Sequence, residues 1–311
     1  MSVLLGIVAP IFGVLALGFL AVKLRVLDEG AVRGLVLYVF NFAVPLLLFR
    51  SLAHLELPPD VEWSLLLSYF GGALTVFGLA LLTGRLIFHR PLADQAIFGM
   101  SGGFSNTVLM GLPILLTAYG PEATLPIFLI IGFHGPILMP LTTGLIQMDR
   151  GGKGALATQA RAILLDIGKN PIILGLLAGF LTNLAGVELP GPLDRVAEMV
   201  GGTTVPCALF ALGAALASYP LTGDVPPALI LMSLKLLVHP ALVWVLAVPV
   251  FGLEGIWVKV VVTMAAMPTG VNAYLFGARY EAAPGVAART MLLSTVASVL
   301  TISVVLFLFS A

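Results

Sequence analysis

The sequence predicts an all-α polytopic membrane protein with ten transmembrane helices, arranged as two inverted five-helix repeats. Three observations support this fold class. The chain of 311 residues is 59% hydrophobic and only 10% charged, which leaves too little polar surface for a water-soluble protein of this size. Apolar stretches long enough to cross a bilayer as helices recur along the whole chain. Two of these stretches carry Asn, Gly and Pro near their middles, in reflected order.

The ten candidate spans follow one another with short connections. The first keeps its charges, Lys23 and Arg25, behind the apolar run, which is the order of a retained first helix and not of a cleavable signal. The polar stretch 148–162 is predicted as a cytoplasmic linker between a first repeat, 1–147, and a second repeat, 163–311. The predicted spans are 3–22, 31–53, 63–88, 92–118, 121–147, 163–186, 197–218, 226–249, 256–279 and 284–309.

Basic residues gather in alternate loops of this topology. The loops after the odd-numbered spans hold Lys23, Arg25, Arg33, Arg85, Arg90, Arg150, Lys153, Arg161, Lys169, Arg279 and Arg289, whereas the other loops hold Arg50, Arg195 and Lys259. Positive loops stay in the cytoplasm, so both termini are expected outside. Because each half has an odd number of helices, five, the two halves would lie in the membrane with opposite orientations. This predicts the inverted repeat.

Two predicted spans contain helix-breaking residues at mid-depth. The first carries Ser105 to Pro113, reading SNTVLMGLP, and the second carries Ala266 to Ala273, reading AMPTGVNA. Proline lacks a backbone donor and clashes with the preceding turn, so each span is predicted to break near its proline. Broken helices at corresponding places in two halves of a chain indicate a transporter binding site.

The residues of the two breaks predict an anion site. Asn106 and Thr107 precede the first break, and Thr269 and Asn272 flank Pro268 in the second. The exposed N-terminal end of a half-helix attracts anions, and an asparagine amide can donate to a carboxylate. The alternative is that Asn and Pro only kink packed helices or hold them together.

Two basic side chains are predicted inside the membrane. His134 lies mid-span in the stretch GFHGP and either contacts substrate or titrates; the alternative is a neutral histidine at a helix interface. Lys235 lies deep in its span, where it either pairs with backbone carbonyls or acts as a fixed cation. The sequence leaves both roles open.

The sequence lacks the residue patterns that an enzyme, a metal site or a nucleic-acid-binding protein would need. All fifteen Asp and Glu fall in loops or at helix ends of the predicted topology, and no metal-binding or hydrolase motif occurs. An enzyme, a metal site and a bound cofactor are therefore not expected. The net charge is zero without a basic tail, which argues against nucleic acid as a partner, and the single Cys207 cannot form an intrachain disulfide.

The chain resembles the auxin efflux carrier family, which includes plant PIN auxin exporters and bacterial malonate transporters. The resemblance covers essentially the whole sequence. It is carried by Pro10, Leu17 to Leu20, Phe40 to Phe49, Asn106 to Pro113, Lys169 to Pro171, Ala265 to Thr269, Arg279-Tyr280 and Leu292 to Thr295.

The resemblance implies a fold shared with bile-acid symporters and sodium/proton antiporters. In that fold a scaffold domain and a transport domain move relative to each other as an elevator, and broken helices 4 and 9 cross. Asn106, Pro113, Pro268 and Asn272 would lie at the crossing, where a substrate carboxylate binds, and the scaffold would form a homodimer. The long cytoplasmic loop of plant exporters is missing here, and Leu48 replaces a hydroxyl that some of them carry.

The function expected from these observations is secondary transport of small organic anions, such as auxin-like or malonate-like acids, across a bacterial inner membrane. One charge crossing 100 mV changes the free energy by about 2.3 kcal/mol, and a negative interior drives anions outward. Export or uniport is therefore expected. The alternatives are coupling to H⁺ or Na⁺ and, in another class, a membrane sensor that binds without transporting.

Overall fold

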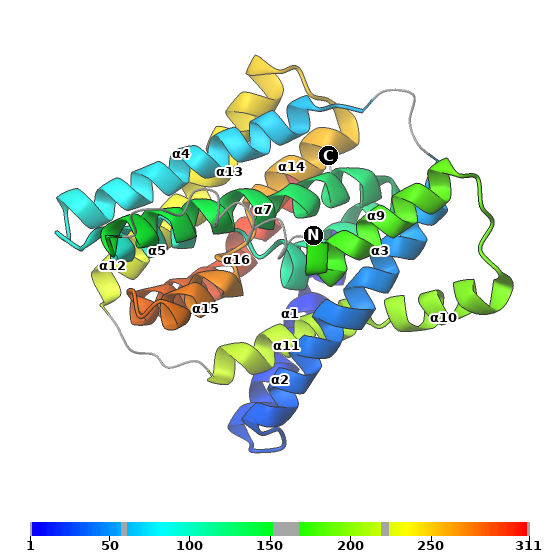
Figure 1. The fold of residues 1–311 in the computed structure, drawn as a ribbon, viewed down its shortest axis with the longest axis horizontal. Helices are drawn as coiled ribbons and strands as arrows, with labels where there is room; N and C mark the ends of the chain where they lie inside the picture. The colour runs from blue at the N-terminus through cyan, green and yellow to red at the C-terminus, as the bar shows by residue number, and fades with distance from the viewer. Residues whose placement is uncertain (1, 57–60, 152–167, 219–223, 310–311) are drawn as a thin grey trace. The chain divides into compact units, whose positions relative to one another are not determined.

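The computed structural model describes residues 2–56, 61–151, 168–218 and 224–309, and within them the chain is helical (Figure 1). The α-helices are α1 (Ser2–Lys23), α2 (Glu29–Tyr38), α3 (Val44–Ala53), α4 (Ser64–Leu86), α5 (Leu92–Gly103), α6 (Leu112–Tyr119), α7 (Thr124–Asp149), α9 (Pro171–Leu184), α10 (Gly191–Gly201), α11 (Thr204–Ser218), α12 (Val225–Ser233), α13 (His239–Val245), α14 (Gly255–Ala265), α15 (Val271–Arg279) and α16 (Pro284–Leu308). A short 3₁₀ turn, η3 (Gly120–Ala123), leads into α7.

Seven stretches of the described chain are helical, apolar and long enough to cross a bilayer. They are Gly6–Lys23, Glu29–Ala53, Ser64–Leu86, Thr107–Asp149, Gly191–Ser218, Val225–Val250 and Pro284–Leu308, and two shorter apolar helices are Pro171–Leu184 and Gly255–Ala265. The structure thus confirms an all-helical membrane protein, with seven candidate spans where the sequence predicts ten. The difference arises mainly because the predicted spans 92–118 and 256–279 are interrupted.

Two other predicted boundaries differ from the structure. The predicted span 197–218 begins inside a separate amphipathic helix, α10, which ends at Gly201 before α11 starts at Thr204. The polar residues Asp194, Arg195 and Glu198 make α10 unlike its apolar successor. The predicted linker 148–162 lies mostly outside the described residues, although α7 continues through Asp149.

Three prolines lie at points where the helical structure continues through them. Pro45, Pro113 and Pro240 each follow a π turn, namely η1 (Val39–Ala43), η2 (Thr107–Gly111) and η4 (Leu234–Val238). Each turn contains the residue four before the proline, whose carbonyl the proline ring would otherwise strike. The wider turn removes that clash, and the helix continues. A further π turn, η5 (Leu246–Val250), contains Pro249 itself.

The chain divides into two compact units, neither of which matches a half of the sequence. Unit 1 consists of 1–61, 108–132 and 160–218, and unit 2 consists of 62–107, 133–159 and 219–311. Each unit therefore combines segments from before and after the predicted linker.

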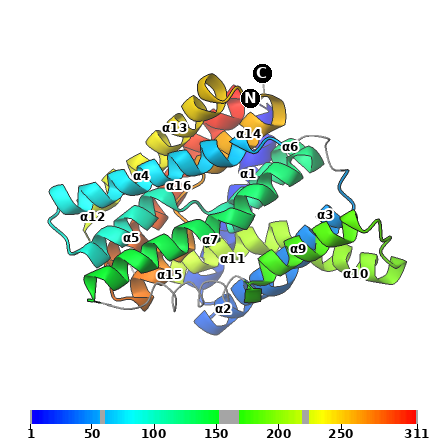
Figure 2. The same ribbon diagram turned by 45° about the horizontal axis from the view of Figure 1, so that its top comes forward.

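Unit 1 is built from two close helix pairs, α1 with α11 and α3 with α9 (Figure 1 and Figure 2). Glycine allows the close approach. A Cβ on Gly213 would lie 1.9 Å from the carbonyl oxygen of Leu15, and one on Gly179 would lie 2.4 Å from that of Phe49. Any larger side chain at these points would push the helix backbones apart.

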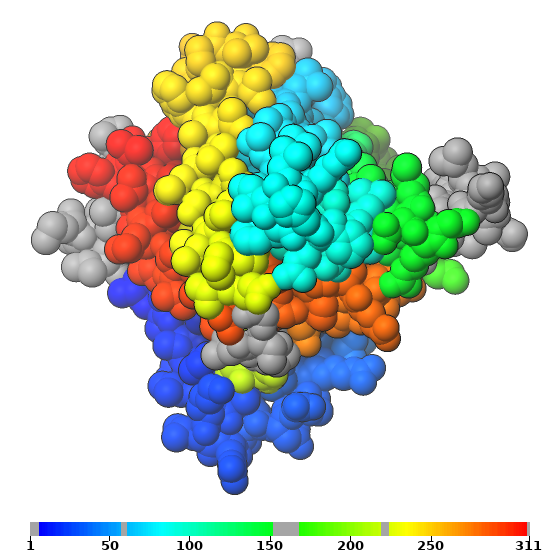
Figure 3. Space-filling view, turned by 90° about the vertical axis from the view of Figure 1, so that its left-hand side faces the viewer, coloured from blue at the N-terminus to red at the C-terminus, as the bar shows by residue number. Residues whose placement is uncertain are grey.

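Unit 2 combines α4, α5, the later part of α7, and the helices from α12 to α16. On the face seen in Figure 3, α4 (cyan) and the α12–α13 segment (yellow) lie side by side. α4 also packs against α5. The core of this unit includes Phe77, Ile97, Met100 and Phe104. The helices α5 and α15, one from each interrupted span, both contribute to this core, α15 through Ala273.

Candidate functional site

Both motif segments interrupt their helices. α5 ends at Gly103, and the helix resumes at Thr107 with η2. α14 ends at Ala265, and the helix resumes at Val271 with α15. The prediction that these two spans are broken is therefore confirmed.

The two interruptions pair with each other as short extended segments, which we call the crossing (103–107 and 265–271). Ser105 and Thr269 form an antiparallel bridge. The N–H of Asn106 donates to the carbonyl of Pro268 at 2.8 Å, and the N–H of Gly270 donates to the carbonyl of Phe104 at 2.9 Å. Backbone groups that lost their helical partners are satisfied here by the other segment.

Three neighbouring helices complete the hydrogen bonding of the crossing, two through side chains and α5 through a backbone carbonyl. The N–H of Thr269 donates to Oγ of Ser294, on α16, at 3.1 Å. Oγ1 of Thr269 donates to the carbonyl of Ser101, in the last turn of α5, at 2.7 Å. The N–H of Ser105 donates to Nε2 of His134, on α7, at 3.1 Å. All of these residues are buried, so the extended conformation is held firmly.

Four buried polar atoms around the crossing have no partner in hydrogen-bonding geometry: Oγ of Ser105, Nδ2 of Asn106, Nδ1 of His134 and the hydroxyl of Tyr69. The ring centroid of Tyr69 lies 5.6 Å from that of His134. Because Nε2 of His134 accepts from Ser105, a neutral ring carries its proton on the unpartnered Nδ1. Unpartnered buried polar atoms indicate a place for a polar ligand or water.

The sequence did not indicate Tyr69. It lies on α4 within a long apolar stretch, where a tyrosine is ordinary, and no motif surrounds it. Only the fold brings its fully buried ring beside His134.

The predicted site residues do not all lie at the crossing. Asn106, Thr107, Pro268, Thr269 and His134 do, and Asn272 lies half-buried in the first turn of α15. Pro113 does not: it lies in the first turn of α6 and belongs to unit 1. The helix breaks before Asn106 and not at Pro113, because the π turn η2 accommodates the proline.

A buried lysine contacts the end of α14. Nζ of Lys235, in η4, donates to the carbonyl of Ala265 at 2.7 Å and lies 2.8 Å from Nδ1 of His239. Both side chains are fully buried. Of the two roles that the sequence left open for Lys235, pairing with a backbone carbonyl is thus observed.

The titratable side chains that contact the crossing, His134 and Lys235, are of the basic type. Among the residues that the structure describes, no Asp or Glu is buried, and no group of three His, Cys, Asp or Glu side chains could hold a metal ion. The crossing therefore offers hydrogen-bond donors and a lysine, which suit an anion.

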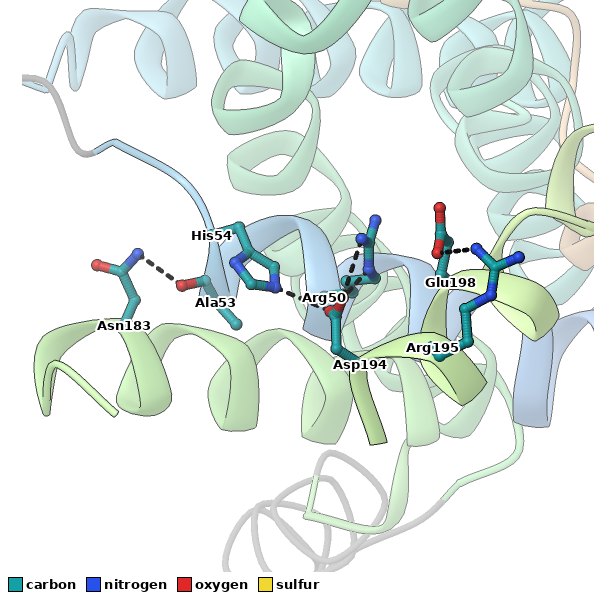
Figure 4. A network of polar contacts seen from close by, with 7 residues as sticks. All are labelled: Arg50, Ala53, His54, Asn183, Asp194, Arg195 and Glu198. Atoms are coloured by element: carbon teal, nitrogen blue, oxygen red, sulfur yellow. Dashed lines mark hydrogen bonds and ion pairs between the residues drawn. The ribbon is translucent and has the colours of Figure 1, made fainter. Parts of the chain in front are cut away.

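A second polar network lies in unit 1 and connects α3, α9 and α10 (Figure 4). Arg50 donates twice to Asp194, at 2.8 and 3.1 Å, and Nε2 of His54 lies 2.8 Å from the same carboxylate. Nδ2 of Asn183 donates to the carbonyls of Leu52 and Leu55 at the end of α3. Asn183 supplies a hydrogen-bond donor to carbonyls at the C-terminal end of α3, and the pair Arg50–Asp194 attaches α10 to α3. The network therefore has a structural role.

Comparison with known proteins gives a consistent set of relatives. A family model described as membrane transport protein matches residues 3–306. The chain is 29% identical over 309 residues to a "Putative malonate transporter" of Rhizobium meliloti (strain 1021), which covers 99% of this chain and 96% of that protein. It is 22% identical to auxin efflux carrier component 8 of Arabidopsis thaliana, over 88% of this chain and 89% of that protein.

The family match extends over nearly the whole chain, including both interrupted helices. The match confirms the resemblance to auxin efflux carriers. Because the matching family is one of membrane transport proteins, it also agrees with the expectation that the protein is not an enzyme. The chain belongs to the membrane transport protein family, together with auxin efflux carriers, and is a transporter and not an enzyme.

Proposed function

We propose that the protein is a secondary transporter of small organic carboxylates, such as malonate-like or auxin-like acids, and that the carboxylate binds at the crossing. One observation carries this proposal: Nδ2 of Asn106, a residue only 5% exposed, is an unpartnered donor beside two half-helix N-termini. A buried amide without an acceptor is costly unless a ligand supplies one.

The chemistry of the crossing favours an anion over a cation. The helix segments that start at Thr107 and Val271 both begin here. A helix N-terminus carries about half a positive charge and directs free N–H groups toward a ligand. Asn106 Nδ2 and His134 Nδ1–H can add side-chain donors, and Ser105 a hydroxyl. The relative described as a malonate transporter supports a carboxylate as the substrate class.

The wider mechanism is proposed from the distribution of elements. Both interrupted helices contribute to unit 2, whereas the glycine-packed pairs α1–α11 and α3–α9 belong to unit 1. Unit 2 would then be the transport domain and unit 1 the scaffold of a homodimer. In this proposal the repeats 1–147 and 163–311 are inverted, the transport domain moves as an elevator, and both termini lie outside a bacterial inner membrane.

Transport driven by the membrane potential is the favoured energetic mode, which gives export or uniport of the anion. Symport with H⁺ or Na⁺ is the alternative, since unwound carbonyls can bind Na⁺ without acidic side chains. A sensor that binds without transporting is the third candidate, and the description of the matching family model as a membrane transport protein favours transport over it.

Binding and flux in proteoliposomes test the proposal. Malonate and indole-3-acetate should raise the unfolding temperature of the purified protein, since a ligand of the folded state stabilises it by mass action. Labelled malonate should show counterflow. Asn106→Ala should abolish both effects, whereas the control Asn41→Ala should not, because Asn41 already donates to the carbonyl of Leu37 on its own helix. Normal binding by the Asn106 variant would exclude the crossing as the site.

A further inference from the structure

Arg279 and Tyr280 lie at the end of α15 remote from the crossing, and the proposed anion site does not use them. α15 starts at Val271, the last residue of the crossing, and ends at Arg279. The ring of Tyr280 packs against the core of unit 2, and its centroid lies 5.8 Å from that of Phe276. The ring is therefore a fixed platform at this end of the unit.

Two guanidinium groups meet the ring of Tyr280 from different helices. The carbon Cζ of Arg279 lies 5.6 Å from the ring centroid. The carbon Cζ of Arg150, the residue that follows α7, lies 5.9 Å from it. A guanidinium group within about 6 Å of an aromatic centroid is attracted to the ring. The ring thus holds two positive charges close to each other.

Neither guanidinium group has a carboxylate partner among the described residues. Asp149 precedes Arg150 and Glu281 follows Tyr280 in the chain, yet neither acid forms an ion pair with Arg150 or Arg279. Two like charges held close together repel each other, and an anion that contacts both removes that repulsion. Three other arginines do pair with Asp or Glu, namely Arg50, Arg90 and Arg195.

A structural role accounts for one of the two arginines. The C-terminal end of a helix carries partial negative charge and exposes carbonyl groups. Arg150 serves that end, because its guanidinium group donates to the carbonyl of Tyr280. Arg279 is exposed, and among the described residues its guanidinium group contacts only the ring. Its five N–H donors form a fork that matches a carboxylate.

The same face of α15 leads from Arg279 to the crossing. Asn272 lies half-buried in the first turn of α15. Residues seven apart share one face of an α-helix, since two turns take about seven residues. The rise along the helix places Arg279 about 10 Å from Asn272. An anion at the two arginines is therefore one short helix away from the crossing.

We propose that Arg150 and Arg279, supported by the ring of Tyr280, form an outer binding site for a small organic carboxylate. The transported anion binds there before it moves along α15 to the crossing. The inference rests on the proposed function and adds a second station to it. The headgroup of an anionic lipid is the other source of an oxyanion for two guanidinium groups, and the experiment below separates the two sources.

Arginine-specific labelling tests the site directly. Phenylglyoxal modifies accessible guanidinium groups, and mass spectrometry of peptides follows each residue separately. In lipid-free detergent, malonate at about twice its Kd should slow the modification of Arg279 about threefold relative to chloride of equal ionic strength. The protection should persist in Asn106→Ala, which disables the crossing. Arg85, an exposed arginine in the last turn of α4, is the control and should react equally fast with and without malonate.

Counterflow of labelled malonate shows whether the site lies on the path. In vesicles of phosphatidylcholine alone, Arg279→Gln should lower kcat/KM about three- to tenfold and leave the rate at saturating malonate unchanged, because an outer cation raises the local concentration of the anion. The reduction should shrink at high salt, which screens a surface charge. Arg279→Lys keeps the charge and should retain most of kcat/KM, and Arg85→Gln should match wild type.

Three results would each overturn the inference. One is protection of Arg279 that disappears in Asn106→Ala, because it would then report a change at the crossing. Another is an unchanged kcat/KM in Arg279→Gln. The third is protection by phosphatidylglycerol in mixed micelles without protection by malonate, which assigns the site to a lipid headgroup. A wild-type protein that transports no malonate overturns the proposed function as well, whereas normal wild-type flux with any of the three results overturns the outer site alone.

Discussion

The N–H of Asn106 donates to the carbonyl of Pro268 at 2.8 Å, and this hydrogen bond joins two interrupted helices from opposite parts of the chain. It uses the only backbone group that Pro268 can offer, since proline has no N–H. The side-chain nitrogen Nδ2 of Asn106 has no hydrogen-bond partner. The backbone of Asn106 thus holds the crossing while its side chain can serve a ligand.

Gly270→Ala tests whether the two segments must approach this closely. A Cβ at position 270 would lie 2.8 Å from a ring carbon of Phe104 and 3.0 Å from the carbonyl oxygen of Ser105. Overpacking of this kind costs about 1–3 kcal/mol, so we expect a lower unfolding temperature and loss of malonate flux. Gly78→Ala is the control, because a Cβ there meets nothing within 4 Å and should leave stability equal or slightly higher.

Thr269→Val tests the hydrogen bond between the crossing and α5. The substitution keeps the shape of the side chain but leaves the buried carbonyl of Ser101 without its donor at 2.7 Å. We expect the free energy of unfolding to fall by about 1–3 kcal/mol, measured by thermal or denaturant unfolding in detergent. Thr75→Val, which removes an exposed hydroxyl bonded within its own helix, should change it much less. Equal effects would contradict the role assigned to Thr269.

The sequence predicted the helical class and the two interruptions because both depend on local chemistry. Apolar length determines which segments cross a bilayer, and the stretches SNTVLMGLP and AMPTGVNA lack the residues that keep a helix continuous. The sequence predicts the first break near Pro113, whereas the helix is interrupted between Gly103 and Thr107. A π turn accommodates Pro113 without ending the helix, and the sequence alone does not indicate where a π turn forms.

Tertiary contacts account for what the sequence could not predict. Tyr69 meets His134, and Lys235 meets Ala265, only after distant helices pack together. The predicted span 197–218 joins the end of α10 to α11, because the apolar residues on one face of α10 resemble a continuation of the α11 span. The binding roles of all the predicted site residues remain predictions, namely those of Asn106, Thr107, Pro113, His134, Pro268, Thr269 and Asn272.

Pro268→Ala should affect transport more than stability. The carbonyl that accepts from Asn106 is kept, but the new N–H and the loss of the ring allow α14 to extend beyond Ala265 as a helix. We expect an unfolding free energy within about 1 kcal/mol of wild type and a strongly reduced malonate counterflow. Pro113→Ala, in a helix that already continues through its proline, should reduce counterflow less. The opposite order would mean that the interruption at Pro268 is not needed for transport.

His134 has two nitrogen atoms with separate roles, and two substitutions distinguish them. Nε2 accepts from the buried N–H of Ser105 at 3.1 Å, whereas Nδ1 has no partner. His134→Leu leaves that N–H unsatisfied and should cost about 1–3 kcal/mol of stability. His134→Gln can present an oxygen to Ser105 and should cost less.

If Nδ1–H donates to the substrate, both variants should bind malonate more weakly, as isothermal titration would measure. A Leu variant as stable as wild type would show that Nε2 does not support the crossing, and unchanged malonate affinity in both variants would remove Nδ1 from the site.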